Sequence, residues 1–100
     1  MKIIRHGDVL LTPITQLPRH AQAKTGVTLA RGEVTGHSHR ILEAHQAQMF
    51  SAGTDNFLEI TSPKATLVHE EHHAIVLERG LYKVWMQREY RPDANRWVED

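Results

Sequence analysis

Apolar and polar side chains alternate along several short stretches of the chain. Residues 27–36 (VTLARGEVTG) and 57–61 (FLEIT) alternate at every second position, and residues 80–90 (GLYKVWMQREY) are rich in aromatic and branched side chains. Residues 7–14 begin with Gly-Asp and continue as an apolar, branched run. Alternation with a period of two is typical of a half-buried strand, so each of these stretches is predicted to be a β-strand.

Turn-forming residues separate the predicted strands. Residues 15–26 are polar and contain a proline, Gly-Thr-Asp-Asn at 53–56 forms a turn, and Ser-Pro-Lys at 62–64 is predicted to end a strand. Two further strand candidates follow at 65–70 and 74–80.

About eight short strands, with few stretches typical of helices, predict an all-β fold. A chain of 100 residues has the length of one domain. We therefore expect a small single-domain β-barrel or sandwich over residues 1–100, in which roughly the last ten residues (91–100) form a C-terminal arm.

The composition of the chain argues against several functional classes. Lys plus Arg and Asp plus Glu both number 12, so the net charge is zero, which argues against a nucleic-acid partner. The chain has no cysteine and no run long enough to span a membrane, so we expect a soluble cytoplasmic protein without thiolate metal sites. Three of its eight histidines stand alone and are expected at the surface or as caps: His6, His20 and His45.

The other five histidines form two clusters. His37 and His39 are two residues apart, and His69, His72 and His73 lie in the run HEEHH. Two histidines at alternate strand positions point the same way, about 6–7 Å apart at the backbone. That spacing suits two ligands of one metal ion.

The run HEEHH also matches His-Glu-x-x-His, the zinc-binding pattern of many metalloproteases. In such a site the motif lies on a helix and its glutamate, here Glu70, is the general base. Within residues 63–79, the stretches on either side of HEEHH contain β-branched residues (TLV and AIV). The apolar positions form two blocks and do not follow helical spacing. We therefore favour strands here and keep the zinc protease as an alternative.

The stretch GEVTGHSHRILE resembles the first motif of the cupin family, with Gly32, His37, His39 and Glu43 in the motif positions. The spacer after the glycine has four residues where cupins usually have five, and the second cupin motif is absent. The resemblance implies a cupin-like barrel in which the two histidines and the glutamate bind a metal, joined by a later histidine. The candidates for that later histidine are His69, His72 and His73.

The first hypothesis is a small metal-binding β-protein, either a metal-dependent enzyme or a protein that binds a small molecule. The metal would be a divalent ion (Zn, Fe, Mn or Ni), since the ligands are mostly imidazoles. Glu43 or Glu70 would serve as the carboxylate ligand or as the catalytic base. The sequence does not decide whether His72 or His73 faces the site, because a shift of one residue reverses the face of a strand.

A second hypothesis is a non-catalytic module that assembles into a homo-oligomer through its strands, with histidines at the interface. A third is nucleic-acid binding or cleavage with histidines as acid and base, which the neutral charge disfavours.

Overall fold

Antiparallel strands account for most of the molecule. The computed structural model describes residues 2–31 and 36–89. Its strands are β1 (Ile4–His6), β2 (Val9–Ile14), β3 (Gln22–Lys24), β4 (Thr28–Arg31), β5 (Ser38–Ile41), β6 (Ala47–Ala52), β7 (Asp55–His69) and β8 (His72–Met86), and its 3-10 helices are η1 (Ala44–Gln46) and η2 (Gln87–Glu89). The described residues contain no α-helix, so the prediction of an all-β fold is confirmed.

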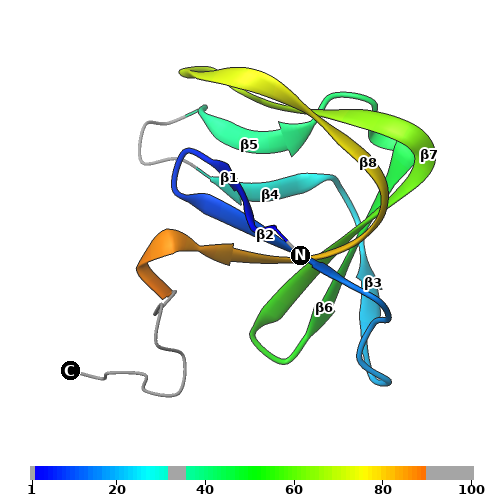
Figure 1. Cartoon of the computed structure of the whole chain (residues 1–100). Coiled ribbons are helices and arrows are strands. Elements are labelled where there is room, and N and C mark those ends of the chain that lie inside the picture. Colours follow the sequence, from blue (N-terminus) through cyan, green and yellow to red (C-terminus); the bar gives the residue numbers. More distant parts are fainter. Residues whose placement is uncertain (1, 32–35, 90–100) are drawn as a thin grey trace.

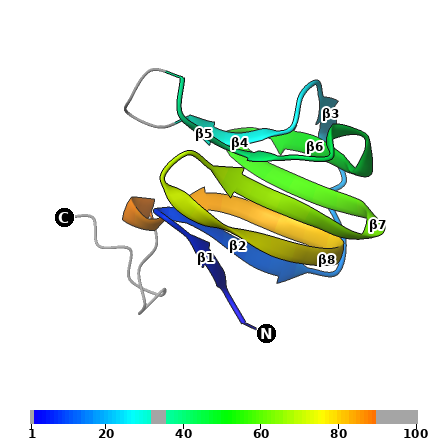
Figure 2. The same cartoon turned by 90° about the horizontal axis from the view of Figure 1, so that it is seen from above.

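All the strands belong to one sheet that curls into half of a barrel. Neighbouring strands follow the order β1-β2-β8-β7-β5-β4, and β6 pairs with β7 and carries β3 on its other side. The curl is visible in Figure 1, where β7 and β8 bend round the right-hand side of the molecule. In Figure 2, β4 and β5 lie in one layer and β1, β2 and β8 in another. The apolar core fills the space between these layers.

The bend in β7 explains the curl. This strand of 15 residues pairs with β6 from Asp55 to Ile60 and with β5 at Leu67 and Val68. Its register against β8 shifts between Ile60 and Lys64. Pro63 lies in this interval and has no N–H to donate to a neighbouring strand. The prediction that residues 62–64 end a strand was wrong, because the strand continues past the irregularity and only changes direction.

The partner strand β8 is also continuous where the sequence indicated a break. Gly80 pairs with Ile60 and has a φ of 152°, a value that glycine tolerates far better than other residues. Residues 74–80 and 80–90 were predicted as separate strands, but the structure joins them into one strand that ends at Met86.

The core contains side chains from both layers. Each fully buried Leu or Ile contributes about 1.5–3 kcal/mol relative to an exposed position. The largest side chains with no more than about 1% exposure are Val9, Leu11, Met49, Leu58, Ile60, Leu67 and Leu77.

Other sequence predictions need smaller corrections. The segment 15–26, predicted as a loop, contains the short strand β3. His37 and His39 were expected at alternate positions of one strand, but β5 begins at Ser38, so only His39 lies within it. The proposed arm at 91–100 lies outside the described residues. None of the helices in the described part of the chain is long and apolar enough to cross a membrane.

Candidate metal centre

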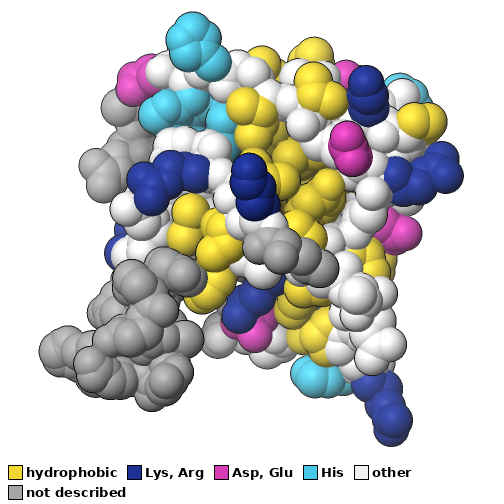
Figure 3. Space-filling model, viewed as in Figure 1, with side chains coloured by type: hydrophobic (Ala, Val, Ile, Leu, Met, Phe, Trp, Pro, Cys, Tyr) yellow, Lys and Arg dark blue, Asp and Glu magenta, His cyan; other side chains and the backbone are white. Residues whose placement is uncertain are grey.

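Histidine rings gather at one end of the curled sheet. They are His6 at the end of β1, His37 just before β5, His39 within β5, His69 at the end of β7 and His72 at the start of β8. Neighbouring ring centroids are 4.3 to 5.7 Å apart. Figure 3 shows histidine side chains concentrated at the upper left of the molecule, while others lie at distant corners.

Strand register brings these residues together. Arg40 pairs with Val68 in the antiparallel β5–β7 ladder, so His39 lies beside His69. His69 in turn pairs with His72 across a two-residue turn. The β1–β2 turn reaches the same end of the sheet (Figure 1) and adds His6. Residues far apart in sequence thus form one cluster, which neither half of the chain contains alone.

Two groups of residues in this cluster could hold a metal ion. Potential ligand atoms of His39, His69 and His72 all lie within 4.8 Å of one another, and those of His37, His69 and Glu70 do so as well. We call the first group the histidine triad. Since His69 belongs to both groups, it occupies the centre of the cluster.

Hydrogen bonds fix which nitrogen of His39 is available to a ligand. His6 Nε2 lies 2.9 Å from the carbonyl oxygen of His73. A carbonyl only accepts, so this nitrogen carries the proton and the neutral His6 ring has a bare Nδ1. His6 Nδ1 lies 2.9 Å from His39 Nδ1, which must then donate. The lone pair of His39 is therefore on Nε2, so this nitrogen is available to a metal ion.

Both members of this pair are neutral at pH 7. Burial lowers the pKa of the His39 imidazole to about 4, and the neighbouring rings of His69 and His6 contribute to this shift. Burial also lowers the pKa of His6, which is only 3% exposed. Neutral imidazole is the form that binds metal ions.

Two further histidines of the cluster, His37 and His69, have polar partners of their own. His37 Nδ1 lies 3.1 Å from a carboxylate oxygen of Glu71, so it is the donor and its Nε2 is free. His69 Nδ1 accepts the backbone N–H of Glu71 at 3.0 Å. In the neutral ring the proton of His69 therefore lies on Nε2, and binding a metal through this residue requires that hydrogen bond or that proton to move.

Glu70, proposed as ligand or base, links two strands. Its Oε1 accepts the backbone N–H of Ser38 at 3.0 Å, and its Oε2 lies 3.0 Å from Nη1 of Arg40. The Ser38 N–H and, to a smaller extent, Arg40 lower the pKa of this carboxyl to about 2. A carboxylate with both oxygens engaged and so low a pKa is a poor general base, although its oxygens lie within reach of His37 and His69.

Glu43, the glutamate of the cupin-like motif, lies away from the cluster. Its two carboxylate oxygens accept the backbone N–H and the hydroxyl of Thr66, at 2.7 and 2.8 Å. These bonds also lower its pKa. The chain turns into η1 directly after Glu43, so this side chain holds the end of β5 against β7.

A pocket of about 810 Å³ opens beside the histidine triad. All three triad histidines line it together with His37, and Asp8 and Glu71 add carboxylates. Its size lies within the range of small-molecule sites. An ion held on the triad would therefore be accessible to a small molecule.

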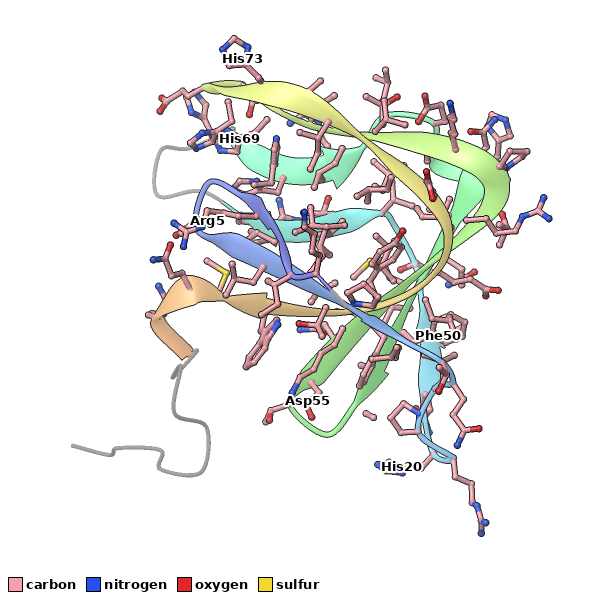
Figure 4. The ribbon with its side chains drawn as sticks, viewed as in Figure 1. Arg5, His20, Phe50, Asp55, His69 and His73 are labelled. Atoms are coloured by element: carbon pink, nitrogen blue, oxygen red, sulfur yellow. The ribbon has the colours of Figure 1, made fainter. Side chains whose placement is uncertain are left out.

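His73 does not join the cluster. Its side chain is exposed and points away from the molecule at the tip of the β7–β8 hairpin, whereas His69 lies on the inner side (Figure 4). The run HEEHH forms the end of one strand, a turn and the start of the next. The helix that a His-Glu-x-x-His protease site needs is absent from this segment.

Sequence reasoning missed two members of the site. His6 was expected at the surface, yet it is buried against His39; its only sequence signal was its place before Gly-Asp at the start of a strand. Glu71, the partner of His37, stands beside Glu70, and the sequence gives no reason to prefer one over the other.

Comparisons with known proteins identify the family of the chain. Neither the curated proteins nor the solved structures contain a match to the chain. A family model described as a domain of unknown function (DUF8820) matches residues 5–87, which include all five histidines of the cluster. The match covers most of the chain, which therefore belongs to the DUF8820 family.

Proposed function

We propose that this protein binds one divalent transition-metal ion on the histidine triad and uses it to bind or activate a small molecule in the adjoining pocket. The observation that carries the proposal is the pair of hydrogen bonds that His6 makes, one to the carbonyl oxygen of His73 and one to His39. Together they determine which ring nitrogens carry a proton. These bonds leave the lone pair of His39 on Nε2, and a ring nitrogen of His39 lies within 4.8 Å of ring nitrogens of His69 and His72. Three imidazoles beside an open pocket suit Zn, Fe, Mn or Ni.

The cupin-like interpretation is part of this proposal. Two facts support it: both histidines of the resembling motif lie in the cluster, and later histidines from distant strands join them. Glu43 departs from the pattern because Thr66 engages both its oxygens. The carboxylate of the site must therefore come from elsewhere in the chain.

Metal content tests the proposal. Protein purified without an affinity tag should contain about one equivalent of a divalent metal, and His39→Ala/His72→Ala should contain none. The matched control is His20→Ala/His45→Ala, which removes two exposed histidines outside the cluster and should keep the metal. A folded wild-type protein that neither contains nor takes up a metal would refute the proposal, as would equal loss in both double variants.

Metal binding should also change the turn between β7 and β8. The bond from the Glu71 N–H occupies Nδ1 of His69, so an ion bound by either nitrogen of this ring disturbs that bond. The backbone amide signal of Glu71 in an NMR spectrum should therefore shift when metal is added. An unchanged Glu71 signal at full metal occupancy would exclude His69 as a ligand.

A further inference from the structure

The turn between β1 and β2 lies directly against the histidine triad. Gly7 in this turn has a φ of 63°. A Cβ atom at this position would lie 2.7 Å from Nε2 of His72 and 2.9 Å from Cε1 of His39. Only glycine allows so close an approach, and the approach determines where the next residue, Asp8, is placed.

Asp8 directs its carboxylate at the available nitrogen of His39. Its Oδ1 is 3.7 Å from His39 Nε2. The hydrogen bonds of His6 to the His73 carbonyl and to His39 place the ring proton of His39 on Nδ1, so both facing atoms present lone pairs. Two such atoms repel each other unless a cation or a donor lies between them.

The backbone of Asp8 is fixed and its side chain is free to turn. The carbonyl oxygen accepts the N–H of Gln87 at 2.7 Å, which ties the turn to the end of β8. The side chain is 61% exposed and lines the pocket. A rotation of the carboxylate therefore does not require movement of the strands.

The glutamates near the cluster already have partners. Glu70 is bound by Ser38 and Arg40, and Glu71 lies against His37. We propose that Asp8 is the carboxylate ligand of the metal centre, so that three imidazoles and one carboxylate hold the ion. This inference rests on the proposed function, because it assigns a further ligand to the same site.

The distance agrees with a shared ion. Bonds of about 2.1 Å from Asp8 Oδ1 and His39 Nε2 to one ion would enclose an angle of about 120° at the present separation of 3.7 Å. Asp8 lies outside the triad as defined by the 4.8 Å limit, so its side chain would have to turn toward His69 and His72 to share an ion with them. The carboxylate also reduces the positive charge of the centre, which favours a divalent ion in a partly buried site.

The test compares metal affinity in Asp8→Asn, Asp8→Ala and the wild type by competition with a chelator. Asp55→Asn is the matched control, because Asp55 is an exposed aspartate at the opposite end of the molecule (Figure 4). Both Asp8 variants should bind cobalt(II) or zinc at least about 10-fold more weakly, and the control should bind as the wild type does. Thermal unfolding of each metal-free variant separates loss of fold from loss of ligand.

A second measurement separates a ligand from a charge that acts at a distance. At saturating cobalt(II), loss of a ligand changes the visible absorption spectrum of the ion, whereas a distant charge changes only affinity. Altered spectra in both Asp8 variants support the proposal. Wild-type affinity, or weaker affinity with an unaltered spectrum, would overturn it while leaving the histidine triad intact. A wild-type protein that binds no metal would instead refute the proposed function itself.

Discussion

Nδ1 of His6 and Nδ1 of His39 lie 2.9 Å apart, and only one of them can carry a proton. The carbonyl of His73 settles which one, because it accepts from the other nitrogen of His6. A main-chain oxygen on β8 thereby determines the protonation of a ring on β5 through a ring on β1. His6 is a positioning residue in this arrangement, since it orients His39 without facing the pocket itself.

Replacing His6 should weaken metal binding without abolishing it. His6→Phe keeps a ring of similar size but removes the acceptor for His39 Nδ1, so the tautomer and orientation of His39 are no longer fixed. We expect metal affinity, measured by chelator competition, to fall about 10- to 100-fold. His6→Asn retains an acceptor near the position of Nδ1 and should recover part of this loss.

The comparison between the two variants contains its own control. Both change the same buried position, so a general packing defect would affect metal-free stability and metal affinity together. If Asn and Phe weaken metal binding equally while the metal-free proteins differ in stability, the hydrogen bond to His39 has no part in metal binding.

Gly7→Ala should disturb the metal centre through direct contact. The new Cβ would meet His72 Nε2 at 2.7 Å in a turn with a φ of 63°. Gly53→Ala is a matched control, because Gly53 has a φ of 64° and a Cβ added there would meet nothing within 4 Å. Both changes should cost about 1–2 kcal/mol in the free energy of unfolding through the backbone alone, measured with denaturant.

Of the two variants, only Gly7→Ala should also lower metal affinity, because the Cβ added at Gly7 would contact the histidine triad and the Cβ added at Gly53 would not. Equal metal affinity in the two glycine variants would show that the β1–β2 turn can move away without consequence, and would remove the argument for close contact.

The strands were largely predictable because their signal is local. Alternation of apolar and polar residues and short apolar runs depend only on neighbours along the chain, and they located β2, β4 and most of β7 and β8. Where the prediction failed, pairing between strands determined the structure. Pro63 and Gly80 are typical of strand ends, yet the pairing of β7 with β8 on both sides of these residues continues the two strands through them. A sequence pattern marks an irregularity but does not show whether a neighbouring strand bridges it.

The site was predictable only where its residues cluster in sequence. His37, His39, His69 and His72 stood out as pairs, and the structure brings all four together. His6 could not be recognised, because its role depends on β1, an edge strand that is separated from β5 by three other strands in the order of the sheet. Glu43 fits a motif by spacing, but the short β5 strand directs it toward Thr66.

The bond between Glu43 and Thr66 should make stability depend on pH. The N–H and hydroxyl of Thr66 lower the pKa of Glu43 below its ordinary value of 4.5. A lowered pKa means that the contribution of Glu43 to stability is complete above the unfolded value and is lost as pH falls through the folded value. The difference in melting temperature between the wild type and Glu43→Gln should therefore be constant above about pH 5.5 and shrink below about pH 4.5.

Thr66→Val provides the control for this prediction. It removes the hydroxyl but keeps the backbone N–H, so the difference between Thr66→Val and Thr66→Val/Glu43→Gln should shrink less steeply in acid. If the difference in melting temperature between the wild type and Glu43→Gln stays constant down to about pH 3, the pKa of Glu43 is the same in the folded and the unfolded protein.

Glu70→Gln distinguishes a structural role from a catalytic one. The substitution places an amide where a carboxylate now meets Arg40 at 3.0 Å, while the other oxygen can still accept from Ser38. The hairpin tip should lose stability and the protein should melt at a lower temperature. The triad retains its three imidazoles, so the metal content of the protein should stay at about one equivalent.

A double-mutant cycle with Arg40→Met isolates the contact itself. If the Glu70–Arg40 pair holds the tip of the β7–β8 hairpin against β5, the double variant should lose less stability than the two single variants together, because the second change removes a partner that is already unpaired. Strictly additive losses would mean that the two side chains stabilise the fold independently. Loss of the metal in Glu70→Gln would instead place this carboxylate among the ligands, as the group it forms with His37 and His69 allows.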